Sequence, residues 1–181
     1  MVRTHVDTHG AFGDGRGPNA HDDAPIFQML LDTLEPGSVI EYGPKTYTIK
    51  STLAFPPGKN ITLECMAPGS GQLWFSPNIV GLSIRGHNVT LRNVSIYGQA
   101  PQAGVPSNRN AHGIDMSFNA NLDNVRAMYF QGNGIHIDTA NGNANSWHIV
   151  NSTSSQNKGH GLYLRGADAN AGLAMNLQTA D

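Results

Sequence analysis

The sequence predicts an all-β fold, a right-handed parallel β-helix (a solenoid) with an amino-terminal capping α-helix. Three observations predict it: a glycine-led strand pattern that recurs in the second half of the chain, a second strand series that carries asparagines, and an amphipathic helix signal near the start. The glycine-led segments alternate apolar and polar residues, as strands with one buried face do. They are Gly81–Arg85, Gly113–Ser117, Gly134–Asp138 and Gly161–Arg165.

The second series runs out of phase with the first, and its asparagines lie 31, 27 and 25 residues apart. Because one such unit cannot bury its apolar side alone, the recurrence indicates coils stacked along one axis. We expect the asparagines of successive coils to hydrogen-bond one another. An antiparallel sandwich with Asn-rich loops is the alternative, although it does not require the same strand at each period. The segments are Thr90–Val94, Asn121–Val125, His148–Ser152 and Leu173–Leu177.

Composition agrees with a turn-rich all-β chain. The 181 residues include 21 Gly, and only 13% are charged, whereas a helical bundle would be rich in Ala, Glu, Lys and Leu. This length suits one domain, which we divide into a cap with the first coil (1–60) and further coils (61–181). The net charge of −2 without a basic cluster argues against nucleic acid as a partner. The single cysteine, Cys65, is expected to be a buried apolar residue.

The first residues, Met1–Val6, lack the apolar segment of a signal peptide, and no stretch approaches membrane-spanning length. We therefore expect no membrane partner. If the natural protein is exported, its signal has been removed or it leaves by another route.

A capping helix is expected after Asp22 and Asp23, either of which can cap it, and Pro25 suits its first turn. Its apolar face should cover the open end of the β-helix, where strand edges and core are otherwise exposed. Two strands, Ser38–Tyr42 and Lys45–Ile49, follow as a pair joined by a Gly43-Pro44 turn. The apolar face consists of Ile26, Phe27, Leu30, Leu31 and Leu34.

Two later segments depart from the coil pattern. Gln99–Asn110 contains two prolines and a glycine and is predicted to leave the stack as an insertion loop, a kind of segment that often edges a binding surface. Leu173–Asp181 has the pattern of the start of another coil, and no second cap follows it. We expect a fragment, or an end that another chain covers, for example in a homo-oligomer.

The first third of the chain also carries a series of short motifs. They are Val6–Gly15 (Val-Asp-Thr-His-Gly-Ala-Phe-Gly-Asp-Gly), Asp22-Asp23, Pro36-Gly37, Gly43–Tyr47 and Pro57–Leu63. In this order they resemble the amino-terminal cap and first coil of the pectate-lyase-like superfamily. The chain departs from that pattern by His9 beside Thr8 where one Phe is usual, by extra residues before Asp22, and by a missing second glycine in the turn before Tyr47.

The resemblance implies a parallel β-helix fold. It does not imply one reaction, because the superfamily includes polygalacturonase-type hydrolases, alginate epimerases and phage tailspike depolymerases. Its members suggest a polysaccharide as the partner and an extracellular or virion-associated location.

Alternation assigns outward side chains to the glycine-led strands. Because neighbouring coils lie about 4.8 Å apart, side chains at equivalent positions form columns. One strip therefore gathers carboxylates, histidines, arginines and an aromatic ring. The outward columns are Ser83, Asp115, His136, Tyr163 and Arg85, Ser117, Asp138, Arg165, with His112, Asn133 and His160 just before the glycines.

This strip suits an acidic sugar polymer, because aromatic rings stack on sugars, arginine pairs with uronate carboxylates, and Asp or His transfers protons. The backbones of Asp115 and Asp138 are expected about 8 Å apart. A carboxyl separation of about 6.5 to 9.5 Å is typical of inverting hydrolases. The predicted catalytic residues are Asp115 and Asp138 as the acid/base pair with His136 and His160 assisting, and the predicted substrate-binding residues are Arg165, Tyr163 and His112.

Other interpretations stay open. An outward strip of polar residues is also what any solvated β-face has. A metal held by the three histidines follows no established ligand spacing, and calcium between the two carboxylates lacks a dense acidic cluster, so we predict no metal and no cofactor. The sequence thus predicts a lyase or glycoside hydrolase for an acidic polysaccharide, or alternatively a non-catalytic polysaccharide-binding or structural β-helix, as in a phage or secreted fibre.

Overall fold

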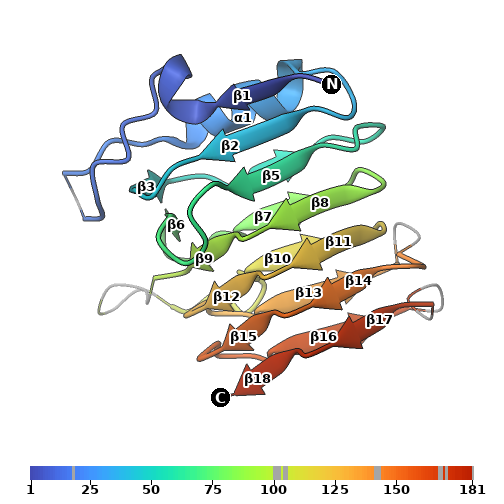
Figure 1. The fold of residues 1–181 in the computed structure, drawn as a ribbon. Helices are drawn as coiled ribbons and strands as arrows, with labels where there is room; N and C mark the ends of the chain where they lie inside the picture. Colours follow the sequence, from blue (N-terminus) through green and yellow to red (C-terminus); the bar gives the residue numbers. More distant parts are fainter. Residues whose placement is uncertain are drawn as a thin grey trace.

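The structure is a computed structural model that describes residues 1–17, 19–99, 103, 106–140, 144–166, 169 and 171–180. Its strands stack in successive coils from the amino-terminal to the carboxy-terminal end (Figure 1). In chain order the elements are β1 (Arg3–His5), the 3₁₀ helix η1 (Val6–His9), α1 (Ala24–Thr33), β2 (Val39–Tyr42), β3 (Thr46–Ile49), β4 (Leu53–Phe55), β5 (Thr62–Cys65), β6 (Gln72–Phe75), β7 (Leu82–Ile84), β8 (Val89–Arg92), β9 (Ser95–Tyr97), β10 (Ile114–Met116), β11 (Ala120–Asp123), β12 (Arg126–Met128), β13 (Ile135–Asp138), β14 (His148–Val150), β15 (Thr153–Ser155), β16 (Leu162–Arg165), β17 (Leu173–Met175) and β18 (Gln178–Ala180).

Within the described residues the strands form three parallel sheets. Sheet A has the order β1-β2-β5-β8-β11-β14-β17, sheet B the order β3-β6-β9-β12-β15-β18, and sheet C the order β4-β7-β10-β13-β16. A full coil therefore gives one strand to each sheet, and the apolar core fills the space between the sheets. The predicted right-handed parallel β-helix is confirmed.

Both predicted strand series occupy the expected places. The glycine-led series supplies sheet C, where Asp115 lies opposite Ser83 of one neighbouring coil and His136 of the other. Alternating residues such as Ile114 and Ile135 are fully buried. The side chains between them therefore face outward as a regular column.

The asparagine series supplies sheet A and ends each of its strands with a left-handed residue. Asn93, Asn124, Asn151 and Asn176 have φ between 51° and 58°. The amide of Asn124 donates to the side-chain oxygen of Asn93 at 2.8 Å, and Asn176 donates likewise to Asn151 at 3.0 Å. The expected asparagine contacts are thus present in two of the three neighbouring pairs. The backbone gives a second reason for asparagine here, since asparagine tolerates this conformation better than most residues.

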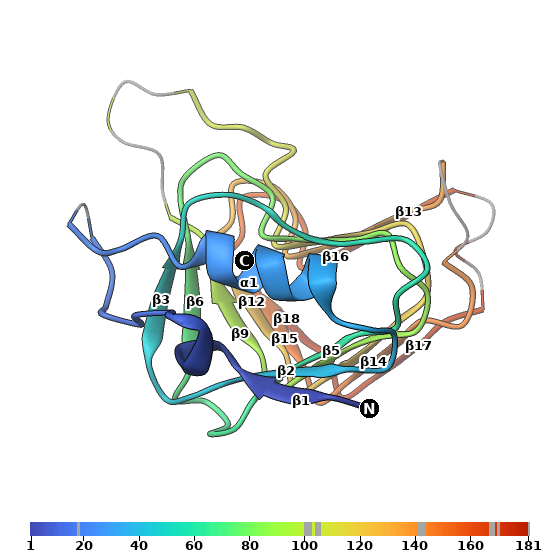
Figure 2. The ribbon, with the colours of Figure 1, turned by 90° about the horizontal axis from the view of Figure 1, so that it is seen from above.

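Helix α1 lies across the amino-terminal end of the stack, as Figure 2 shows. Phe27, Leu30 and Leu31 are buried against the first coil, whereas Ile26 and Leu34 are partly buried. The predicted cap is confirmed. Asp22 accepts a hydrogen bond from the backbone of Ala24 at 3.0 Å.

Asp23, the other expected cap residue, instead binds the first loop. Its carboxylate accepts from the backbone N–H groups of Phe12 at 2.7 Å and Gly13 at 3.2 Å. The side chain is fully buried and makes no hydrogen bond to the helix. Burial raises the pKa of Asp23, and the two N–H donors counteract this only in part. The Asp-Asp motif thus fixes both the helix and the loop before it.

Two sequence interpretations need correction or completion. The strands β2 and β3 exist, but they belong to different sheets, so Gly43-Pro44 forms a corner of a coil and the two strands do not pair with each other. The predicted insertion loop Gln99–Asn110 falls in part on residues 100–102 and 104–105, which lie outside the described residues.

Cys65 is buried, as expected.

The last coil presents its side chains to solvent. Leu164, which lies opposite the fully buried Ile137, is 42% exposed. Leu177 packs only partly against the core. In the described part of the chain, no helix combines the length and the apolar character needed to cross a membrane.

Candidate functional site

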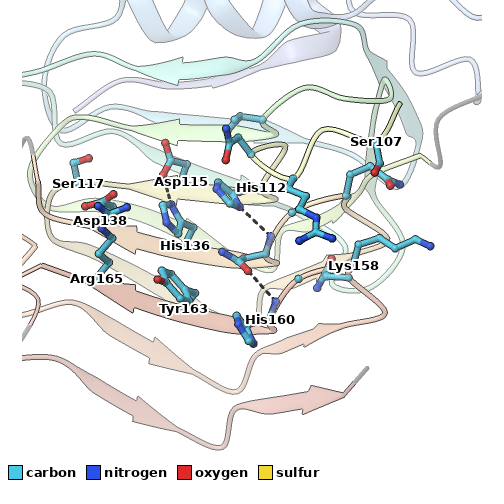
Figure 3. Close-up of a pocket in the computed structure, with 18 of the residues that line it drawn as sticks. Ser107, His112, Asp115, Ser117, His136, Asp138, Lys158, His160, Tyr163 and Arg165 are labelled. Atoms are coloured by element: carbon cyan, nitrogen blue, oxygen red, sulfur yellow. Dashed lines mark hydrogen bonds and ion pairs between the residues drawn. The ribbon is translucent and has the colours of Figure 1, made fainter. Parts of the chain in front are cut away.

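A groove of about 1250 Å³ lies on the outer face of sheet C and the turns that lead into it (Figure 3). It is lined by every residue for which the sequence predicted a role. These are Asp115, Asp138, His136, His160, Arg165, Tyr163 and His112. The one-coil register of the β-helix therefore brings the predicted strip together in one place.

Four rings form a ladder across the groove. His112 and His136 stack with ring centroids 4.0 Å apart, His136 and Tyr163 at 5.5 Å, and Tyr163 and His160 at 5.6 Å. The ring planes differ by at most 20°. Because His112, His136 and Tyr163 come from successive coils, the spacing of their rings follows from the spacing of the strands, whereas His160 precedes Tyr163 in the same coil.

A hydrogen-bonded chain crosses three coils beside the ladder. Arg85 donates to one carboxylate oxygen of Asp115 at 2.6 Å and to the hydroxyl of Ser117 at 2.9 Å. The other oxygen of Asp115 lies 2.8 Å from Nδ1 of His136. Burial raises the pKa of Asp115, but the hydrogen bonds and charges of His136 and Arg85 outweigh burial and leave the pKa below its usual value. Asp115 is therefore ionised at neutral pH.

The ionised carboxylate fixes the tautomer of His136. An ionised carboxylate only accepts hydrogen bonds, so Nδ1 of a neutral His136 must carry the proton. Its Nε2 is then the free basic nitrogen. The side chain is 14% exposed, which leaves the ring accessible from the groove while it is held on the other side.

His112 has the opposite tautomer. Its Nδ1 accepts from the backbone N–H of Asn133 at 2.9 Å, so the proton of the neutral ring lies on Nε2. Burial, reinforced by the nearby His136, lowers the pKa of His112 to about 4. This ring is a neutral hydrogen-bond donor at neutral pH, next to His136.

The turns below the ring ladder hold one another in place. The side-chain oxygen of Asn133 accepts from the backbone of His160 at 2.8 Å, and that of Asn157 accepts from Phe130 at 3.0 Å. Asn157 also donates to the carbonyl of Ala127 at 3.1 Å. These hydrogen bonds join each coil to the next and fix the positions of the groove residues along the axis of the β-helix.

The groove also holds cations that the sequence interpretation left out of the site. Arg109 and Lys158 come from turns, where period-two alternation gives no signal, and alternation puts Arg85 in an outward column without indicating its role. Within the described residues, Arg109, Lys158 and Arg165 make no ion pair or side-chain hydrogen bond. Among the described carboxylates of the groove, Asp138 lacks a cation partner, and it accepts from the N–H of Ala140 at 2.9 Å.

No group of three or more His, Cys, Asp or Glu side chains is placed to hold a metal ion in the part of the chain that the structure describes. The three histidines of the groove lie on successive coils, where His112 stacks on His136 and His160 stacks on Tyr163.

No family model and no curated protein matches the sequence. Among solved structures, the chain is similar to ORF18 of Geobacillus virus E2, with a TM-score of 0.72 and 16% identity over 98% of this chain. It is also similar to the pectate lyase Pel9A, with a TM-score of 0.62 and 16% identity over 94% of this chain. It spans 35% and 48% of the lengths of those two chains. At such identities the likeness shows the fold alone, a parallel β-helix.

Proposed function

We propose that this chain binds an acidic polysaccharide in the groove and cleaves it, with His136 as the base. One observation carries the proposal: a histidine whose Nδ1 is held by a carboxylate that Arg85 keeps ionised, in an open groove beside unpaired cations. A carboxylate that orients an imidazole and stabilises its protonated form is a recurrent device of general-base catalysis.

The charge of the groove supports an anionic substrate. The groove is lined by four arginine or lysine side chains and by two carboxylates, and among the described residues Arg85 is the one of these cations with an ion-pair partner. The chain as a whole carries a net charge of −2, so the positive charge is local. Guanidinium groups bind carboxylates in two-pronged fashion, and an open groove admits a polymer.

Of the two reactions predicted from the sequence, the geometry favours elimination. The base takes the proton on the carbon beside the uronate carboxylate, and a cation stabilises the charge that develops there. The bond to the glycosidic oxygen then breaks and leaves a carbon–carbon double bond. The departing oxygen takes a proton from a neighbouring acid, for which Asp138, His160 and Tyr163 are the candidates.

Hydrolysis by the pair Asp115 and Asp138 is the second reaction. The low pKa of Asp115 makes it unable to serve as the acid, so Asp138 would have that role and Asp115 would activate water. Arg85 and His136 already occupy the two oxygens of Asp115, which leaves this carboxylate poorly placed to bind a water as well. We therefore rank elimination first.

The experiment compares the parent chain with His136→Ala on polygalacturonate, alginate and hyaluronan. Cleavage is followed by the absorbance of unsaturated uronate and by reducing ends. We expect His136→Ala to lower kcat by about 100-fold or more, the usual range for loss of a general base, with binding retained. His148→Ala is the matched control, because His148 is exposed on sheet A, remote from the groove, and bonds to Asn121.

Each result that differs from this expectation contradicts a different part of the proposal. Reducing ends without unsaturated product would establish hydrolysis. Binding without cleavage would support the non-catalytic alternative, and unchanged cleavage by His136→Ala would refute the assigned base. Because such polymers occur at cell surfaces, we expect the protein to act outside the cell or on a virion.

A further inference from the structure

Gln131 lines the groove yet has an unsatisfied side chain. It is 4% exposed, and its Oε1 has no hydrogen-bond partner among the described residues. Buried polar atoms without a partner are rare in proteins, and each needs a reason, such as a group that a ligand supplies. A hydrogen-bond donor is what this oxygen lacks.

The backbone on either side of Gln131 is fixed by neighbouring coils. Phe130 donates its N–H to Asn157 at 3.0 Å, and Gly132 donates to the carbonyl of Ala111 at 2.9 Å. A Cβ at position 132 would meet the carbonyl of Arg109 and the ring of His112 at 2.5 Å, so this turn requires glycine. The backbone of Gln131 thus has a fixed position in the lining of the groove.

The two turn cations of the groove lie on the coils before and after Gln131. The close packing at Gly132 puts the backbone of Arg109 directly beside this turn on one side. On the other side, Lys158 donates its backbone N–H to the carbonyl of Phe130 at 2.9 Å. Both cations are exposed, and Lys158 stands at the edge of the groove in Figure 3.

We propose that Gln131, Arg109 and Lys158 form a subsite for one uronate residue next to the ring ladder. Oε1 of Gln131 is enclosed in the free protein, so on binding the amide turns toward the groove and a sugar hydroxyl donates to Oε1, while the cations bind the carboxylate of the same or the adjoining residue. This subsite rests on the proposed function, since it assumes that the groove holds an acidic polysaccharide. A uronate fits because it offers both hydroxyl donors and a carboxylate.

The test separates hydroxyl from carboxylate recognition. Binding is measured by titration calorimetry in the His136→Ala background, with polygalacturonate and with carboxyl-reduced polygalacturonate as probes, and alginate and hyaluronan as further polymers. Gln131→Met keeps the length of the side chain and removes the acceptor, and we expect it to weaken binding of both probes about tenfold. Lys158→Met should weaken binding of the acidic probe about tenfold and leave the reduced probe unaffected, because its contribution is electrostatic.

Gln178→Met is the matched control, because Gln178 is exposed on β18 and does not line the groove. The thermal midpoint gives an independent readout. Since the acceptor of Gln131 is unsatisfied in the free protein, Gln131→Met should unfold at the parent temperature or above it.

Three results would overturn the subsite. They are unchanged affinity of Gln131→Met for an acidic polymer that the parent binds, a lowered thermal midpoint of this variant, and equal losses in the Gln178→Met control. If the parent chain binds none of the acidic polymers, the proposed function fails as well, so this result is distinct from the other three.

Discussion

His112 couples the protonation of the groove to the stability of the fold. Its folded pKa of about 4 lies below the ordinary value of 6.5, because the ring is buried next to His136. Between these values the unfolded chain binds more protons, so the free energy of unfolding rises with pH. The contribution is complete above pH 6.5, is lost as pH falls toward 4, and amounts to about 3 kcal/mol at most.

We therefore expect His112→Asn to flatten the dependence of the thermal midpoint on pH between 6.5 and 4. Asp115 and His136 face the same ring, but the pKa of Asp115 lies below this pH window. The measurement is a set of thermal melts at constant ionic strength, with His148→Asn as the exposed control. An identical slope in parent and His112→Asn would mean that the buried ring is not neutral.

Side-chain hydrogen bonds between asparagines of neighbouring coils join the strands of sheet A at their ends. Asn124 combines a φ of 54° with a side-chain bond to Asn93. Alanine at this position loses the bond and strains the backbone, whereas glycine loses the bond alone. We expect Asn124→Ala to lower the free energy of unfolding by about 2 kcal/mol, and Asn124→Gly by about 1 kcal/mol.

Urea denaturation of the two variants measures this difference. Equal losses would show that backbone strain has no part, and no loss in either would show that the ladder does not stabilise the folded chain. Because both variants alter the same half-buried turn, the slope of the transition with urea should stay that of the parent.

At the level of elements, the sequence was informative wherever the backbone repeats. Alternation predicted the outward column of Asp115, His136 and Tyr163, because a strand has a period of two and each coil lies one strand spacing from the next. Alternation could not predict which side chains of the outward columns hydrogen-bond one another. The bond from Arg85 to Asp115 depends on a long side chain that reaches diagonally to the next coil, and this reach changes the role of Asp115.

The sequence could not predict the roles of the turn residues, for a related reason. Gln131 and Lys158 follow no period, since the path of a turn is set by contacts with the coils above and below. The pairing of β2 with β5, and of β3 with β6, likewise comes from the winding of the chain, whereas the local sequence around Gly43-Pro44 is equally suited to a hairpin.

For the molecule as a whole, the described last coil exposes apolar side chains. Its inward column continues the core, and unpaired strand edges lie beside exposed leucine side chains. We expect the purified chain to self-associate through this end. Leu164→Lys, which places a charge in the inward column, should shift the equilibrium toward monomer by about tenfold or more in dissociation constant.

Sedimentation velocity over a range of concentrations tests this expectation, with circular dichroism as the check on folding. Leu173→Lys is the control: Leu173 is 50% exposed, but it lies opposite the exposed His148 on the outer face of sheet A. Monomeric behaviour of the parent, or an equal effect of both substitutions, would rule out association through the end of the stack.

The unequal coil lengths have a consequence for how such a protein can change over evolutionary time. Asp115 lies opposite His136, 21 residues later in the chain, and opposite Ser83, 32 residues earlier, and yet all three stand in adjacent rows. Residues added to a turn leave every later strand in its row, whereas one residue added within a strand would invert the faces of that strand. If the proposed function holds, insertions in the turns can therefore alter which polymer is recognised while His136 and its partners stay in place, so that substrate preference and chemistry are free to diversify separately.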